Sequence, residues 1–296
     1  MSTSDWTENP SVLNDRGRCA YVWYCTDVEY AIAALVFVRL LKERGIRRDV
    51  DLIVLHLPLP EHLLERMRQM GIITQLVAKI NCSSTKSPYR HSFVKLRALQ
   101  QTDYRRVVFI DADSLPLKSL DYLFEVPCEN IAAPAAYWRP QPLWTTALMT
   151  MNPSLESWAR VEKHFPTAMK KGLYDMDIVN LEFGNEIRTL PESCFSLNSE
   201  WEDLERPCFW SNPYEACSEV SVVHFTALGK PWTYSMDEVR RLRPRAYQPF
   251  YDQWQLWQDA RDDVMDSIRL NQILERPELK RHIRMLGTTA PEEKKE

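Results

Sequence analysis

Residues 106–114 read Arg-Val-Val-Phe-Ile-Asp-Ala-Asp-Ser, an apolar run that ends in two aspartates. The β-branched and aromatic side chains predict a buried strand, in which positions i and i+2 point to the same side. We therefore expect Asp111 and Asp113 to converge beyond the carboxyl end of the strand, where open α/β sheets bind ligands. Two carboxylates this close repel each other, so the pair favours a divalent cation that holds a phosphate-bearing substrate. An acidic pair that only caps a turn is the plainer alternative.

The patterns around this strand predict an α/β fold. Before it, strand and helix patterns alternate, which is typical of a doubly wound, mostly parallel sheet. After it, strand and helix patterns alternate less regularly and are separated by long loops rich in aromatic residues. Strands are predicted at residues 20–25, 51–57, 72–80, 131–135, 145–151 and 221–225, and helices at residues 28–44, 61–70, 91–100, 155–169, 175–183 and 247–272. Residues 1–19 are predicted to be disordered, and residues 273–296 to be a helix end followed by a disordered tail.

The net charge and the cysteines limit which partners and which cellular compartment we expect. The formal net charge of −4 gives no electrostatic reason to expect nucleic acid or an anionic membrane as a partner. The longest apolar run, residues 30–38, is too short to cross a bilayer. The seven cysteines form no Cys-x-x-Cys motif, which favours free thiols in a reducing compartment. The cytoplasm is the expected location, with the Golgi lumen as the alternative if a membrane anchor is missing from this chain.

A second group of polar residues follows the predicted strand at residues 221–225. The chain has seven glycines and no glycine-rich phosphate loop, so a metal and side chains must handle any bound diphosphate. His224 ends this strand, and an imidazole beside two carboxylates suits Mn²⁺ better than Mg²⁺. Lys230 follows in the same loop and can reach a phosphate as a point charge. A core histidine and a solvent-exposed lysine are the plainer alternatives.

A third acidic segment lies at residues 172–180 and includes Asp175 and Asp177. One of these two aspartates is expected to cap the helix that begins here. The other is expected to direct its carboxylate at the reacting carbon of a substrate.

These motifs, in this order, resemble glycosyltransferase family eight, the glycogenin-like retaining transferases of the GT-A fold, over residues 20–257. In character the chain is most similar to the fungal N-acetylglucosaminyltransferase branch. The resemblance implies one GT-A domain over residues 20–272 with a mixed, mostly parallel central sheet. Its Rossmann-like nucleotide-binding half would span residues 20–115. The acceptor-side half would span residues 116–272 and end in the C-terminal helix.

The resemblance also implies a role for each motif. Asp111, Asp113 and His224 would bind the metal, and Asp175 would be the catalytic residue near the sugar. The aromatic ring of Tyr30 would pack on uracil. The residues expected to contact the donor or its metal are Thr26, Asp27, Tyr30, Lys95, Asp111, Ala112, Asp113, Thr145, His224, Gly229 and Lys230.

Three positions depart from the family pattern in ways that bear on the donor. Met176 stands where glycogenin-like members carry glutamine, so any role of that amide is lost. Thr145 and Ala147 replace the asparagine and glycine of a sugar-contacting strand. We therefore expect the donor pocket to differ from that of glycogenin.

The expected function is metal-dependent transfer, with retention, of a hexosyl or N-acetylhexosaminyl unit from UDP-glucose or UDP-N-acetylglucosamine. Mn²⁺ is the expected cofactor, with Mg²⁺ as an alternative. The acceptor is a glycan, a protein or a small molecule, and a homodimer is one assembly to expect. Two other classes stay open. One is a haloacid-dehalogenase-type phosphatase, which also carries Asp-x-Asp after a strand, and the other is a non-catalytic sugar-nucleotide-binding protein.

Overall fold

The computed structural model describes residues 17–80, 91–205 and 209–274, with side chains up to residue 269. Most of the two termini that were expected to be disordered lies outside the described residues, as do Cys82 and Cys208. Cys19, by contrast, already belongs to the first strand. The described cysteines are free thiols: Cys19, Cys25, Cys128, Cys194 and Cys217.

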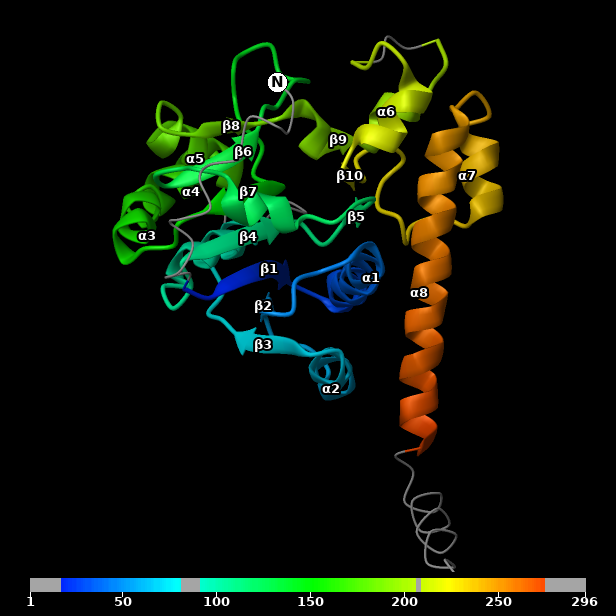
Figure 1. Ribbon diagram of the computed structural model, residues 1–296, viewed down its shortest axis with the longest axis horizontal. Helices are drawn as coiled ribbons and strands as arrows, with labels where there is room; N and C mark the ends of the chain where they lie inside the picture. Colours follow the sequence, from blue (N-terminus) through cyan, green and yellow to red (C-terminus); the bar gives the residue numbers. More distant parts are fainter. Residues whose placement is uncertain (1–16, 81–90, 206–208, 275–296) are drawn as a thin grey trace, which may run out of the picture.

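A seven-stranded sheet forms the centre of the fold (Figure 1). In spatial order its strands are β3 (Ile72–Leu76), β2 (Val50–His56), β1 (Cys19–Cys25), β4 (Arg106–Ile110), β7 (Leu148–Met151), β6 (Ile131–Pro134) and β8 (Arg188–Leu190). The first four run parallel, and β8 is parallel to β6. β7 runs antiparallel to both of its neighbours. The expectation of an α/β fold with a mixed, mostly parallel sheet is confirmed.

Helices cover both faces of this sheet. Alternate residues of β1 face the two layers: Tyr21 and Trp23 belong to one core, and Ala20 and Val22 to the other. The first core is covered by α1 (Val28–Arg44), α2 (Glu61–Gln69) and α8 (Gln248–Leu274), and the second by η3 (Ser92–Gln100), α3 (Leu155–Glu162) and α5 (Asp175–Phe183). Figure 1 shows α8 as a long helix beside α1 and α7 (Met236–Leu242). The remaining helical segments are η4 (Asp121–Glu125), α4 (Phe165–Lys171), η5 (Glu192–Cys194), η6 (Asn198–Trp201) and α6 (Pro213–Glu219).

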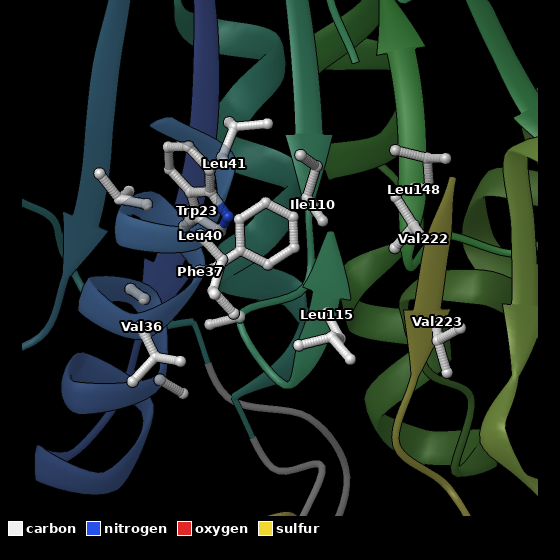
Figure 2. Packing of buried hydrophobic residues seen from close by; sticks show 14 of the residues in the cluster. Trp23, Val36, Phe37, Leu40, Leu41, Ile110, Leu115, Leu148, Val222 and Val223 are labelled. Atoms are coloured by element: carbon white, nitrogen blue, oxygen red, sulfur yellow. The ribbon is translucent and has the colours of Figure 1, made fainter. Parts of the chain in front are cut away.

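A smaller, three-stranded sheet lies beside the carboxyl end of β4. It contains β5 (Ser114–Pro116), β10 (Val222–His224) and β9 (Phe195–Leu197), with β10 antiparallel to β5. Figure 2 shows Leu115 and Val223 of this sheet packed in one core with Phe37 of α1. All three side chains are fully buried, and each such burial stabilises the fold by about 1.5–3 kcal/mol. This packing holds the small sheet against the large one.

Several element bounds differ from the sequence-based expectation. The strand expected at 72–80 ends at Leu76, and the one expected at 145–151 begins at Leu148. The helix expected at 155–169 is two helices, α3 and α4, because Pro166 in the first turn of α4 has no backbone N–H to continue α3. Residues 92–100 form a 3₁₀ helix. Among the helices of the described residues, none has both the length and the apolar composition of a membrane span.

Candidate active site

A cleft of about 410 Å³ opens next to the ends of β1 and β4. It brings together most of the residues singled out from the sequence: Tyr30, Lys95, Asp111, Asp113, Thr145, Asp175, His224, Gly229 and Lys230. Three others, Thr26, Asp27 and Ala112, do not line it. The cleft therefore joins the acidic pair, the histidine loop and the third acidic segment, which are far apart along the chain.

Asp111, Asp113 and His224 form the centre of the cleft. Asp111 follows β4, Asp113 precedes β5, and the register of the small sheet pairs His224 with Ser114. This pairing puts the imidazole Nε2 3.2 Å from Asp113 Oδ1. One ligand atom from each of the three residues lies within 4.8 Å of the others. The antiparallel pairing of β10 with β5 is thus what brings a residue 111 positions away to the acidic pair.

The chemistry of these three side chains fits a divalent cation. Asp111 Oδ1 and His224 Nε2 are buried, and each lies next to a charged side chain of the cluster: Lys95 Nζ is 2.9 Å from Asp111 Oδ1, and Asp113 Oδ1 is 3.2 Å from His224 Nε2. Two carboxylates held this close repel each other, and a bound cation would offset that repulsion and accept lone pairs from all three side chains. Two carboxylates and one imidazole are ligands that Mn²⁺ accepts more readily than Mg²⁺ does.

Lys95 connects the candidate cation ligand Asp111 to Asp175 of the third acidic segment. Its Nζ lies 2.9 Å from Asp111 and 3.1 Å from Asp175 Oδ2, and all three side chains are buried. Burial alone would lower the pKa of Lys95, but the two carboxylates raise it above its usual value. The pKa of Asp111 is raised by burial, which outweighs the effect of Lys95. The pKa of Asp113 is lowered, because Lys230 and His224 outweigh its burial.

The structure separates the two aspartates of the third segment. Asp177 accepts a hydrogen bond from the backbone N–H of Tyr174, 2.9 Å away, and so caps α5. Asp175 instead lines the cleft and accepts hydrogen bonds from Thr146 and Ser92. Burial would raise the pKa of Asp175, but the charge of Lys95 and these hydrogen bonds hold it below the usual value. Asp175 is therefore a buried carboxylate that stays ionised.

The loop after β10 presents Lys230 to the cleft. Lys230 forms an ion pair with Asp113 and donates a hydrogen bond to the Phe225 carbonyl, 3.2 Å away. The turn before it needs two residues with positive φ: Leu228 at 60° and Gly229 at 87°. Glycine adopts such a φ without strain, whereas leucine does not. The loop thus stores backbone strain next to the candidate site, as functional loops often do.

Of the residues expected to bind uridine, some line the cleft and others do not. Asp27 is exposed and caps α1, with its carboxylate 3.0 Å from the backbone N of Tyr30. Thr26 donates a hydrogen bond to the same carboxylate. Ala112 is fully buried in the core. Only Tyr30 of the amino-terminal group lines the cleft, where its ring lies 5.2 Å from that of Trp232.

Some residues of the site had not been singled out from the sequence. Ser92 and Thr146 hold Asp175, and Tyr24 lines the cleft beside them. Asn198 accepts hydrogen bonds from the backbone N–H groups of Thr226 and Ala227, both 2.8 Å away, and so holds the loop that carries Lys230. Thr146 could have been noticed as the neighbour of Thr145. Nothing in the local pattern around Asn198 indicates its contacts, because they form between distant segments.

Sequence comparison finds distant relatives. The chain matches no protein-family model. It is 26% identical over 248 residues to glucose N-acetyltransferase 1 of Gibberella zeae, a match that covers 74% of this chain and 54% of that protein. It is 27% identical over 232 residues to glycogenin-2 of Homo sapiens, which covers 73% of this chain and 44% of that protein. This chain thus spans about half the length of these curated relatives.

Solved structures of glycosyltransferases share the fold of this chain. The chain is similar to galactosyltransferase LgtC in complex with donor and acceptor sugar analogues, with a TM-score of 0.55 and 15% sequence identity. The match covers 76% of this chain and 95% of LgtC. Together, the sequence relatives and this structural match confirm the resemblance drawn from the motifs. The chain is a relative of the glycogenin-like glycosyltransferases, and its fold is the GT-A fold.

Proposed function

We propose that this protein is a metal-dependent glycosyltransferase that moves a hexosyl or N-acetylhexosaminyl unit from a UDP-sugar with retention of configuration. One observation carries the proposal. The candidate cation ligands Asp111, Asp113 and His224 share a cleft with the buried ion pair of Lys95 and Asp175. The cation ligands would serve the diphosphate, and the ionised Asp175 would serve the sugar that leaves the diphosphate.

The diphosphate side of the cleft would be formed by the cation ligands and by Lys230. A bound Mn²⁺ or Mg²⁺ would supply positive charge against the phosphates and the leaving UDP. Lys230 already lies beside Asp113, where its ammonium group can act as a further point charge on a phosphate oxygen. The half-buried ring of Tyr30 supplies a face for the uracil base.

Asp175 would act on the sugar. In the reaction the bond between the anomeric carbon and the diphosphate oxygen breaks, and its electron pair leaves with UDP. The acceptor oxygen forms a new bond on the same face of the sugar, and its proton passes to the departing diphosphate. A buried carboxylate that stays ionised stabilises the positive charge at the anomeric carbon, whether or not it bonds to that carbon. Lys95 and Thr146 hold Asp175 in place for this role.

The alternatives are less well supported. A haloacid-dehalogenase-type phosphatase has a different fold from the GT-A fold found for this chain. A non-catalytic sugar-nucleotide-binding protein would need the cation ligands and Lys230 but would have no use for the ionised, buried Asp175. Activity measurements separate this second alternative from the transferase.

The test is release of UDP from UDP-glucose and from UDP-N-acetylglucosamine in the presence of Mn²⁺. Because the relatives carry the names glucose N-acetyltransferase and glycogenin, both donors are assayed side by side. Asp175→Asn should lower the rate by about 100-fold or more. Asp177→Asn is the matched control, since this helix cap lies two residues away and outside the cleft.

Two results would contradict the proposal. Wild-type protein that binds UDP but releases none from any donor, with a broad panel of acceptors, would be a binding protein. An Asp175→Asn variant as active as the Asp177→Asn variant would remove Asp175 from the chemistry.

A further inference from the structure

Four tryptophans between residues 138 and 210 lie outside the α-helices, and the structure gives one of them a distinct position. Trp144, Trp201 and Trp210 each donate their indole N–H to a partner inside the protein, namely Thr189, the Pro213 carbonyl and Ser196. None of these three lines the cleft. Trp138 lines it together with Asp175.

Trp138 is also the tryptophan that is exposed. Trp138 is 38% exposed, and every other tryptophan among the described residues is buried or half-buried. Asp175, in the same cleft, is only 6% exposed. Trp138 therefore lies toward the opening of the cleft and Asp175 toward its interior. A rigid aromatic ring that is open to water, in the cleft that holds a buried ionised carboxylate, is suited to bind a ligand with an apolar face.

The indole is held in place by its neighbours. The ring of Tyr137 meets it edge-on with a centroid distance of 5.1 Å, and Phe195 lies against it at 6.3 Å. Tyr137 is itself anchored, because its hydroxyl accepts a hydrogen bond from the backbone N–H of Leu197, 3.1 Å away. Phe195 in turn packs 6.0 Å from the ring of His224. Phe195 thus lies between the ring of Trp138 and that of the candidate cation ligand His224.

We infer that the acceptor is a saccharide and that a sugar ring packs on the exposed face of Trp138, with the attacking hydroxyl directed toward Asp175. This inference rests on the proposed transferase function. A pyranose ring presents a face of C–H groups that matches an aromatic plane, while its hydroxyls stay available to polar groups and water. The acceptor has to enter the cleft that holds Asp175, and Trp138 stands at that entrance.

The experiment follows UDP release from the better donor with Mn²⁺ while a trisaccharide is titrated. The probes are maltotriose, cellotriose, xylotriose and α-mannotriose, with a serine- and tyrosine-bearing peptide as the non-saccharide arm. We expect at least one trisaccharide to raise the rate of UDP release. Trp138→Ala should raise the KM for that trisaccharide by about tenfold or more, with a much smaller change in kcat. Trp138→Phe, which keeps an aromatic face, should recover most of the lost affinity.

Tyr214→Ala is the matched control, because Tyr214 is an exposed aromatic residue of α6 outside the cleft. It should leave the KM for the trisaccharide unchanged. Thermal melts of all variants show whether they fold. The inference is overturned if only the peptide raises UDP release, if no probe does, or if Trp138→Ala has the KM of the wild type. A wild-type protein that releases no UDP from either donor would instead overturn the proposed function. The inference alone fails when UDP is released but no trisaccharide raises the rate, so the two failures are distinguishable.

Discussion

Lys95 and Asp175 form a buried ion pair in which Nζ and Oδ2 lie 3.1 Å apart. The same ammonium group lies 2.9 Å from Asp111 and so separates two buried carboxylates that would otherwise repel each other. Three charges that are largely removed from water in this way stabilise the fold only as a set, since loss of one leaves the others unpaired.

Replacement of Lys95 should therefore be costly. We expect Lys95→Met to lower the free energy of unfolding by about 3 kcal/mol, because Asp111 and Asp175 would be left buried without their shared cation. Urea denaturation at pH 7 measures this. Lys170→Met, which changes an exposed lysine of α4, should stay within about 0.5 kcal/mol of the wild type. A Lys95→Met variant as stable as the control would show that the ion pair is dispensable.

Binding of Mn²⁺ should depend on Asp113. We expect the wild type to bind Mn²⁺ in isothermal titration and to melt at a higher temperature when the ion is present. Asp113→Asn should weaken binding by about 100-fold, since it removes a charged ligand and the carboxylate nearest to His224. Asp177→Asn should keep the wild-type affinity, although loss of the helix cap costs about 1 kcal/mol of stability. Equal affinities for the two variants would rule out the proposed cation site.

Asn198 should act as a positioning residue for the histidine loop. Asn198→Leu leaves the backbone N–H groups of Thr226 and Ala227 without their acceptor, which should cost about 3 kcal/mol of stability and weaken Mn²⁺ binding. The amide Nδ2 of Asn198 is buried and donates no hydrogen bond to the described residues. Asn198→Asp therefore keeps the acceptor and loses no donated bond, so its loss of stability and of Mn²⁺ affinity should be smaller. The reverse order of the two variants would argue against this role.

Acid should weaken a group of ion pairs outside the cleft. Glu182 of α5 accepts from Arg160, Lys163 and His164, and although burial acts to raise its pKa, these partners lower it to about 2. A lowered folded-state pKa means that this stabilisation is complete above the unfolded-state value of about 4.3 and is lost as the pH falls toward 2.

Glu182→Gln should accordingly cost about 1 kcal/mol at pH 7, a value reduced for solvent screening around the partly exposed partners. The difference from the wild type should shrink at pH 3.5. Glu65→Gln, on the exposed side of α2, should show no such pH dependence. A gap between wild type and Glu182→Gln that is as large at pH 3.5 as at pH 7 would contradict the assigned pKa.

Much of the fold could be predicted because its signals are local. The apolar run before Asp111 predicts β4, and the alternation before it predicts the parallel part of the sheet. The bounds of α1 agree with the helix pattern, which ends at Gly45 with φ of 95°. The break between α3 and α4 was missed, although Pro166 offered the signal. Most residues of the candidate site were indicated by the order of several motifs along the chain. Each motif alone is too short to be specific, but their combination is specific.

The sequence by itself determined the strands, the helices and the acidic pair, since these depend on the spacing of neighbouring side chains. Only the tertiary structure decided which of Asp175 and Asp177 enters the cleft and which of the loop tryptophans stays open to water. It also brought His224 to Asp113, because the register of β10 on β5 depends on packing of the small sheet against α1. Contacts between residues about a hundred positions apart follow from such packing, and no local pattern encodes them.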